Sequence, residues 1–305
     1  MGGDKCDEKT SCQSCEESEK CSHEEKEAHE QKLVDERMSY VKYKFMVISG
    51  KGGVGKSTVA ANLAMTLVQE GYEVGLMDAD IHGPNIPMML GIENERPSAT
   101  TEGLLPITTV HGLKVVSMAF FLRSSDDAVI WRGPLKHSLI KQFLGEVYWG
   151  DLDYLIIDLP PGTGDEALSV AHLLKKIDGA IVVTTPQDVA LLDSRKSVTF
   201  ARQLQIPLIG IVENMSGFNC PHCHKPIDLF KKGGGERAAR ELLIPFLGRI
   251  PIDPEMVFCG DSGTPLVSKP GHAEVSNVFK QISERWRQLL EGKSGVHHKQ
   301  SVHAT

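Results

Sequence analysis

The segment FNCPHCHKP contains two cysteines, Cys220 and Cys223, with two residues between them. Thiolates at this spacing can bind one metal ion or one iron-sulfur cluster. Two thiolates are only half of the four ligands that a tetrahedral zinc ion or a 4Fe-4S cluster needs, so the other ligands must come from elsewhere. His222 or His224 could complete a small zinc site within the segment. Alternatively, a two-fold axis would bring the cysteine pairs of two chains together, and spacing alone does not choose between zinc and a cluster.

Four further cysteines stand near the beginning of the chain: Cys6, Cys12, Cys15 and Cys21. Five, two and five residues separate them, which is dense enough for a metal site. Three hypotheses remain open for this group: the cysteines bind a second cluster, they bind zinc, or they are thiols that bind no common metal. Cys259 has no partner at metal-binding spacing and follows an apolar run, which favours a packing role.

The stretch VISGKGGVGKSTVAANLAMTL is typical of a phosphate-binding loop. Its GxxxxGK(S/T) pattern lies directly after a predicted strand and directly before a predicted amphipathic helix. Glycines allow the backbone N–H groups to face phosphates at the start of that helix. Lys56 would reach the β and γ phosphates, and the Ser57 hydroxyl would bind Mg²⁺. The residues predicted to bind nucleotide are Gly50, Gly52, Gly53, Val54, Gly55, Lys56, Ser57 and Thr58.

Aspartates follow two other predicted strands. Asp158 ends the apolar run of YLIIDLPPGTGD, where a carboxylate can bind the shell of Mg²⁺ through water. Asp78 and Asp80 lie at a strand end in LMDADIHGPNIP. They can either serve the phosphate site or merely cap a loop. Together with Lys51, the residues Lys56, Ser57, Asp80 and Asp158 are a sufficient set for phosphoryl transfer, which depends on positioning and on stabilisation of charge.

The elements that position these residues follow from the hydrophobic pattern. Short β-branched runs alternate with helical patterns, which predicts an α/β fold of the P-loop NTPase kind, with a mostly parallel twisted sheet flanked by helices. The predicted strands lie in residues 43–50, 73–80, 113–120, 153–160, 179–186, 207–215 and 246–251. A final helical stripe contains Val275, Val278, Phe279, Ile282, Trp286, Leu289 and Leu290, and it should pack on the sheet.

Composition limits the possible classes of protein. The chain has 305 residues, of which 41% are apolar and 24% charged, and a net charge of −7. Residues 1–37 contain twelve Asp/Glu and six Lys/Arg, so the remainder is almost neutral. We therefore expect no nucleic-acid binding, and no apolar run approaches the roughly 18 residues of a membrane span. The start lacks the apolar core of a secretory signal, so we expect a cytoplasmic protein whose cysteines are thiols, metal ligands or redox groups.

Three segments are expected along the chain. Residues 1–37 should form an acidic, flexible tail that carries cysteines, with some helix near its end. Residues 38–291 should form the P-loop domain, and residues 292–305 a flexible C-terminal tail.

Beyond the general pattern, the loop GKGGVGK resembles that of the deviant Walker A group of P-loop ATPases, which includes the MinD and ParA proteins. The segments LMDADIHGPNIP, WRGP, IIDLPPGTGD, TTPQDVAL, VENMSGFNCPHC and GDSGTPLV are similar to the Mrp/ApbC branch, the Nbp-type iron-sulfur cluster carriers. The resemblance extends over about residues 42–290. The cysteine pair separates this branch from the partition and division-site ATPases.

The resemblance implies roles for particular residues. Lys51 would reach across a homodimer to the partner's phosphates, Asp80 would orient the attacking water, and Asn214 would contact the adenine base. Cys220 and Cys223 would hold a labile 4Fe-4S cluster that bridges two subunits and passes to apoproteins. The N-terminal cysteines only partly match the ferredoxin-like motif of eukaryotic-type relatives, because Cys6 stands closer to the others than the first cysteine of that motif.

The sequence thus predicts a slow ATPase that uses ATP and Mg²⁺ and carries a 4Fe-4S cluster as a homodimer, with a possible second cluster near the N-terminus. The rival hypothesis is a MinD/ParA-like positioning ATPase whose cysteine pair binds structural zinc. The sequence does not distinguish adenine from guanine, nor a homodimer from a heterodimer, and it does not name the recipient apoproteins.

Overall fold

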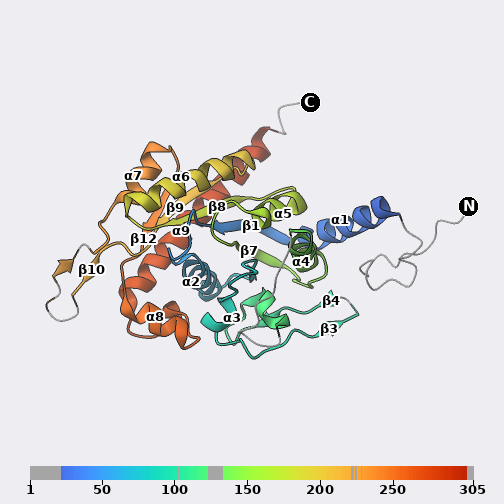
Figure 1. Cartoon of the computed structure of the whole chain (residues 1–305), viewed down its shortest axis with the longest axis horizontal. Coiled ribbons are helices and arrows are strands. Elements are labelled where there is room, and N and C mark those ends of the chain that lie inside the picture. Colours follow the sequence, from blue (N-terminus) through green and yellow to red (C-terminus); the bar gives the residue numbers. More distant parts are fainter. Residues whose placement is uncertain are drawn as a thin grey trace, which may run out of the picture.

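A central sheet of eight strands organises the protein (Figure 1). The structure is a computed structural model that describes residues 22–101, 103–122, 133–220, 223, 225–227 and 229–300. From edge to edge the strands are β12 (Phe246–Arg249), β9 (Ile209–Glu213), β8 (Gly179–Thr184), β1 (Val41–Ile48), β7 (Leu152–Asp158), β2 (Val74–Asp78), β6 (Lys114–Ser117) and β5 (Ile107–Thr108). Only β5 pairs antiparallel within this sheet. Each of the seven predicted strand ranges overlaps one of these strands, which confirms the predicted fold class.

Helices cover both faces of the sheet, and each face has its own hydrophobic cluster. One face is covered by α2 (Lys56–Gln69), α3 (Ile86–Met89), α8 (Pro254–Asp261) and α9 (Ala273–Gln300). The other is covered by α1 (His23–Ser39), α4 (Gly133–Gly145), α5 (Asp165–Leu174), α6 (Asp188–Gln203) and α7 (Gly234–Glu241). Since the inner strands are buried on both faces, they read as continuous apolar runs rather than alternating ones.

The last helix packs as its sequence pattern predicts. Phe279, Ile282 and Trp286 of α9 are fully buried, and the Trp286 ring meets Phe45 of β1 edge-on at a centroid distance of 5.4 Å. Gly179 of β8 lies so close to the Trp286 ring that a Cβ would overlap it. The helix continues to Gln300, past residue 291 where we expected the domain to end.

The first described helix, α1, begins with a reciprocal capping arrangement. Ser22 Oγ accepts a hydrogen bond from the Glu25 N–H at 3.2 Å, and the Glu25 carboxylate accepts one from the Ser22 N–H at 2.8 Å. Leu33, Val34 and Met38 are buried. These side chains recur at helical spacing, so a single face of α1 packs against α4 and α5.

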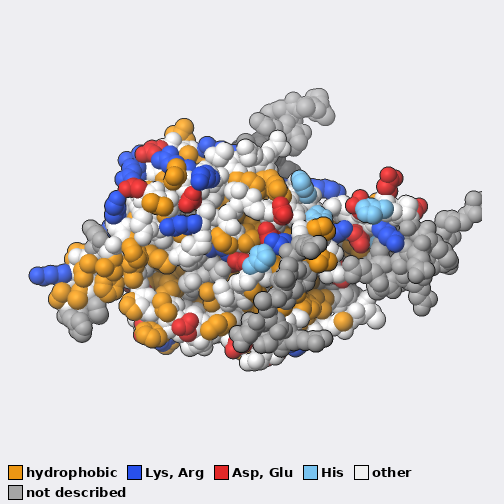
Figure 2. Space-filling model, viewed as in Figure 1, with side chains coloured by type: hydrophobic (Ala, Val, Ile, Leu, Met, Phe, Trp, Pro, Cys, Tyr) orange, Lys and Arg blue, Asp and Glu red, His pale blue; other side chains and the backbone are white. Residues whose placement is uncertain are grey.

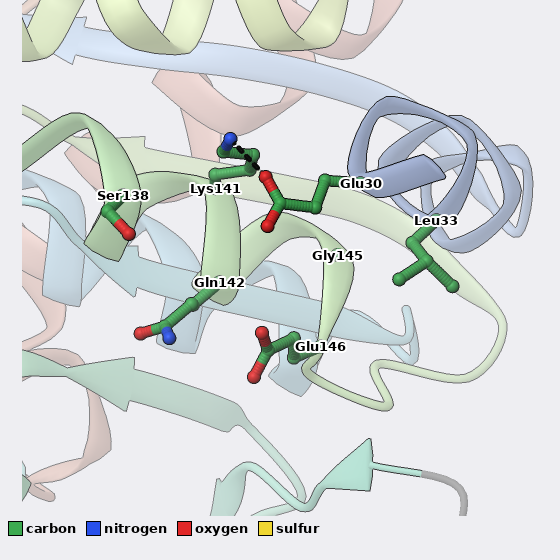
Figure 3. Close-up of a pocket in the computed structure, with 7 residues that line it drawn as sticks. All are labelled: Glu30, Leu33, Ser138, Lys141, Gln142, Gly145 and Glu146. Atoms are coloured by element: carbon green, nitrogen blue, oxygen red, sulfur yellow. Dashed lines mark hydrogen bonds and ion pairs between the residues drawn. The ribbon is translucent and has the colours of Figure 1, made fainter. Parts of the chain in front are cut away.

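Figure 3 shows how α1 and α4 meet around a small pocket. The Lys141 ammonium of α4 donates to the Glu30 carboxylate, and Leu33 of α1 lines the same pocket. Residues 23–37 are helical, as expected near the end of the tail, but they are docked rather than flexible, because the helix offers an apolar face to α4. Residues 1–21 lie outside the described residues.

Smaller elements surround the sheet. Two hairpins pair β3 (Ala99–Thr100) with β4 (Gly103–Leu104) and β10 (Phe218–Asn219) with β11 (Pro226–Ile227), and two 3-10 turns lie at Met118–Phe121 and Leu266–Ser268. The β10–β11 hairpin projects from the edge of the molecule near β12 (Figure 1). Within the described residues, every helix is too short or too polar to cross a lipid bilayer.

Candidate functional site: a phosphate-binding loop and a cysteine arm

The glycine-rich loop joins β1 to α2 at the carboxyl end of the parallel strands. β1 pairs with both β7 and β8, so the loop emerges at the centre of the sheet. Gly55 is the N-cap of α2 and has a φ of 79°, a value that glycine adopts without strain. A Cβ at Gly55 would also collide with the carboxamide of Asn214. The loop thus presents backbone N–H groups at a helix N-terminus, where anions bind.

An open cavity of about 210 Å³ lies over this loop. Its lining consists of Ser49, Lys51, Gly52, Gly53, Val54, Gly55, Lys56, Ser57, Thr58, Asp80, Asn85, Met89 and Pro161. The lining includes every predicted nucleotide-binding residue of the loop except Gly50. Gly50 instead lies against the Asp193 backbone of α6, where a Cβ would overlap. Asn85 and Met89, which the sequence motifs did not indicate, enter the lining from α3 and the residue before it.

Lys56 and Ser57, which line this cavity, form a compact cluster with Asp158. The Lys56 ammonium donates to Asp158 Oδ1 at 2.7 Å, and the Ser57 hydroxyl donates to Asp158 Oδ2 at 2.6 Å. Burial raises the pKa of Asp158, while the Lys56 charge and these hydrogen bonds oppose the rise. A serine hydroxyl beside a carboxylate offers the hard oxygen ligands that Mg²⁺ prefers, so the residues present fit that ion.

The two aspartates after β2 differ in environment. Asp78 is the register partner of Asp158 and is buried, and it accepts hydrogen bonds from Ser117 Oγ at 2.9 Å and from the Asp80 N–H at 3.2 Å. Burial, and then the charge of Asp158, raises the pKa of Asp78 to about 8. Asp80 instead lines the cavity. Of the two aspartates, Asp80 is therefore placed to face a phosphate or a water, whereas Asp78 is buried and bonded to the backbone of Asp80.

Asn214 follows β9 and contacts the phosphate loop directly. Its side-chain amide donates to the Val54 carbonyl at 2.9 Å, and its backbone N–H donates to the Thr184 carbonyl at 2.7 Å. The contact with the nucleotide base remains a prediction for this residue. Lys51, which also lines the cavity, forms no ion pair with any carboxylate in the described part of the chain.

The predicted metal-binding cysteines lie elsewhere. We call residues 217–232, which leave the sheet after β9 and return before α7, the cysteine arm. Cys220 is half-buried and Cys223 is exposed, and the Cys220 N–H donates to the Lys225 carbonyl at 3.0 Å. Among the described residues, no group of three or more His, Cys, Asp or Glu side chains could hold a metal ion. His222 and His224 lie outside them.

The other cysteines divide into two cases. Cys6, Cys12, Cys15 and Cys21 lie outside the described residues. Cys259 of α8 is buried, and burial raises the pKa of its thiol, so the structure gives it the packing environment that its sequence context predicts.

Two buried carboxylates near the site were not among the predicted site residues. Glu213, the last residue of β9, is fully buried, and Glu166, at the start of α5, pairs with Lys136 of α4 at 2.7 Å. The signal for Glu213 was present in the sequence, since a lone charge at the end of the apolar run PLIGIVE must find partners when the strand is buried. Glu166 could be recognised only from the position of α4.

A mostly parallel sheet whose central strand runs into a glycine-rich loop and a helix, with a lysine, a serine and an aspartate clustered at that point, defines the protein as a P-loop NTPase. The chain belongs to the ParA-type family described as NUBPL iron-transfer P-loop NTPases, whose model matches residues 40–287. The expected family resemblance is thereby confirmed.

Individual relatives agree with this placement. The chain is 52% identical over 260 residues to the iron-sulfur cluster carrier protein of Methanocaldococcus jannaschii, covering 85% of this chain and 89% of that protein. It is 48% identical over 259 residues to a cytosolic Fe-S cluster assembly factor, the NUBP2 homolog of Nematostella vectensis, covering 82% of this chain and 96% of that protein.

Solved structures show the same fold. A nucleotide-binding protein from Archaeoglobus fulgidus, in complex with ADP, superposes with a TM-score of 0.71 at 40% identity, over 80% of this chain and 96% of that one. The MinD cell division protein of Aquifex aeolicus has a TM-score of 0.59 at 20% identity, over 80% and 97% of the two chains. The second match shows the fold alone.

Proposed function

We propose that this protein is an ATP-hydrolysing carrier that receives a 4Fe-4S cluster as cargo on Cys220 and Cys223 and transfers it to apoproteins. The observation that carries the proposal is the presence, in one chain, of a phosphate-binding cavity and of an exposed arm that bears a cysteine pair. The names of the relatives from Methanocaldococcus jannaschii and Nematostella vectensis support it, as does the ADP in the Archaeoglobus fulgidus protein.

The nucleotide site would work mainly by positioning charge. Backbone N–H groups of residues 50–58 would hold the phosphates, Lys56 would turn from Asp158 toward them, and Ser57 would bind Mg²⁺ with Asp158 in its outer shell. Asp80 would orient the attacking water. Mg²⁺ would neutralise charge that develops on the phosphate oxygens. Hydrolysis would be slow, because nucleotide occupancy serves to change conformation rather than to drive rapid turnover.

A homodimer would supply the remaining ligands of the cluster. The cysteine arm carries exposed apolar side chains at Ile227, Leu229 and Phe230, and hydrophobic side chains gather over that side of the molecule (Figure 2). Exposed apolar surface of this kind is typical of a contact with another protein. Lys51, which lines the cavity without an ion-pair partner among the described residues, could then reach the partner's phosphates.

The same proposal places the protein in the cytoplasm, with apo iron-sulfur proteins as recipients. The N-terminal cysteines Cys6, Cys12, Cys15 and Cys21 would hold a second cluster. The positioning-ATPase hypothesis, with structural zinc at Cys220 and Cys223, remains as the alternative outcome of the experiment below.

Anaerobic iron-sulfur reconstitution tests the carrier function. We expect the wild type to bind about four irons per dimer at the arm, measured by iron and sulfide content, absorption and solution mass. The double variant Cys220→Ala/Cys223→Ala should lose this cluster and its bridging dimer, and iron that remains would belong to the N-terminal cysteines.

The matched control is Cys259→Ala, which removes a buried thiol and should retain the full cluster. Transfer is measured by the activation of an apoprotein, for example an apo-aconitase. If the wild-type arm binds zinc or no metal under these conditions, the carrier proposal is wrong and the positioning-ATPase hypothesis takes its place.

A further inference from the structure

The cysteine arm is held to the rest of the protein mainly at its two ends. At the first end, the Ser216 N–H donates to the Ile250 carbonyl at 2.9 Å, and the Gly217 carbonyl accepts from the Ile252 N–H at 2.8 Å. At the second end, Gly233 is the N-cap of α7, with a φ of 83°. Between these ends, the hairpin extends away from the sheet (Figure 1). The position of Cys220 and Cys223 therefore depends on what fixes the ends.

One buried carboxylate, that of Glu213, binds both ends of the arm. It accepts hydrogen bonds from the Ser216 hydroxyl at the first end and from the Gly233 N–H, at 2.9 Å, and the Gly235 N–H at the second. Arg249 of β12 adds a fourth contact from its Nε at 3.1 Å. Because the side chain is fully buried, loss of these partners would leave an uncompensated charge in the protein interior.

The surroundings of Glu213 stabilise its negative charge. Burial alone would raise the pKa of Glu213, but the hydrogen bonds from Ser216, Gly233, Gly235 and Arg249 outweigh it and lower the pKa below its ordinary value. The N-terminus of α7 also favours an anion. The carboxylate is therefore ionised at neutral pH, and its hydrogen bonds to the arm are of the strong, charge-assisted kind.

The next residue along the chain is tied to the phosphate loop instead. Asn214 donates to the Val54 carbonyl at 2.9 Å, and its carboxamide fills the space beside Gly55. Successive side chains of an extended segment point in opposite directions. Two adjacent residues thus contact the two sites: Asn214 contacts the phosphate loop, and Glu213 contacts the cysteine arm. Because the two residues share a peptide bond, a shift of the backbone at Asn214 also displaces Glu213.

We infer that Glu213 is a positioning residue that transmits nucleotide occupancy of the phosphate loop to the cysteine arm. This inference rests on the proposed function for its biological meaning, since it names how the cluster-bearing thiols would respond to nucleotide. Nucleotide that moves the loop at Val54 displaces Asn214, and Glu213 carries the displacement to Ser216 and Gly233. The ion pair of Asp188 with Lys231 also joins the arm to α6, and Asp188 pairs with Arg237 of α7 as well, but all three side chains are largely exposed and such pairs contribute little.

Thiol reactivity measures this link without any cluster. Full-length, reduced protein without bound cluster or zinc is treated with iodoacetamide. The reaction is run with and without Mg²⁺ plus nucleotide, which is either ADP or a non-hydrolysable ATP analogue. Peptide mass spectrometry measures the alkylation of Cys220 and of Cys223 separately. In the wild type we expect nucleotide to change the alkylation rate at least about fivefold, the lower end of usual coupling between sites. In Glu213→Gln this ratio should fall to about one, while the nucleotide Kd stays within about threefold.

Glu236→Gln is the matched control, because Glu236 pairs with the same Arg249 at 2.8 Å but is bonded to neither end of the arm. It should respond to nucleotide as the wild type does. Ser216→Ala removes one bond and leaves the buried charge in place, so it tests the inference even where Glu213→Gln folds poorly, and it should reduce the ratio by about half or more.

Two results would overturn the inference: a wild type whose thiols do not respond to nucleotide, or variants that respond as strongly as the wild type. The carrier function fails separately. If Cys220 and Cys223 bind no cluster but their reactivity follows nucleotide through Glu213, the positioning role stands and the carrier proposal falls.

Discussion

At the scale of single residues, the site depends on a few buried ionisable side chains, each of which needs a particular partner. Lys56 and Asp158 are both buried and paired at 2.7 Å, while Asp78 is buried beside them. Burial makes the charges of Lys56 and Asp158 expensive unless each compensates the other, and it favours the neutral form of Asp78. The residues that would perform chemistry on a phosphate are therefore also residues on which stability depends.

Lys56→Met tests the first pair. It should abolish ATP hydrolysis and, in the nucleotide-free protein, lower the free energy of unfolding by about 3 kcal/mol at pH 8, because Asp158 is left buried without its partner. The loss should be smaller at pH 5.5, where a carboxyl with a raised pKa is protonated more easily. Urea unfolding at the two pH values measures both effects. Lys51→Met is the control and should alter stability little, and an equally large loss there would contradict the explanation.

Asp78 predicts a dependence of stability on pH. Its pKa is about 8 in the folded protein against 3.8 for an ordinary aspartate, so the folded state holds a proton that the unfolded state releases. Its contribution is fully present below about pH 4 and is lost as the pH rises to about 8, at up to about 1.4 kcal/mol per pH unit.

Asp78→Asn should remove this dependence. Urea unfolding between pH 5.5 and 8.5 should show a flatter profile for the variant than for the wild type, while Asp151→Asn, at an exposed position, should keep the wild-type slope. Parallel profiles for Asp78→Asn and the wild type would show that Asp78 does not titrate as its environment indicates.

At the scale of elements, α1 is the helix whose role the composition obscured. Its sequence is acidic and polar except for a few apolar side chains, three of which are buried. The helix packs on α4 and α5, and α5 begins at Asp165, shortly after Pro161 of the nucleotide cavity. The N-terminal cysteine segment is therefore attached to the body through a docked helix.

Leu33→Ala should weaken this docking. Leu33 is buried at the pocket between α1 and α4, so its truncation should lower the free energy of unfolding by about 2 kcal/mol. Glu30→Ala, which removes the partly exposed pair with Lys141, should cost less than about 1 kcal/mol. Chemical denaturation of the full chain measures both, with the exposed Glu36→Ala as the control. A Leu33→Ala effect no larger than that of Glu36→Ala would mean that α1 is not docked in solution.

At the scale of the whole molecule, the proposed homodimer would have to cover both the phosphate loop and the cysteine arm, which α6 connects. The exposed apolar side chains include Val189 and Leu192 on α6 as well as those of the arm. α6 contacts the phosphate loop where Gly50 meets Asp193, and it meets the arm where Asp188 pairs with Lys231. A dimer through this surface would sense both sites.

Lys51→Ala tests nucleotide-dependent dimerisation. In metal-free protein with a non-hydrolysable ATP analogue, the wild type should shift toward the dimer mass, measured by light scattering after size exclusion. The variant should dimerise at least about tenfold more weakly, with a nucleotide affinity within about threefold of the wild type, because in the proposed dimer Lys51 would act on the partner's phosphates. Lys42→Ala, at an exposed position at the start of β1, is the control. Equal dimerisation of Lys51→Ala and the wild type would contradict the predicted role of Lys51.

Much of the fold and the phosphate site could be predicted from the sequence because both are encoded locally. Continuous apolar runs mark strands buried on two faces, and a glycine loop between strand and helix marks a phosphate site whatever surrounds it. The loop residues, Asp80 and Asp158 therefore lie together at the carboxyl ends of the parallel strands.

The tertiary structure alone decided which of the polar groups are joined. It separated Asp78, buried and protonated, from Asp80, and it brought Glu213 to both ends of the cysteine arm and Glu166 to Lys136. It also turned part of an apparent tail into the docked helix α1. Most of these partners lie 20 or more residues apart in the chain, and the free energy of a buried charge depends on every group packed around it, so no local pattern of residues contains the information.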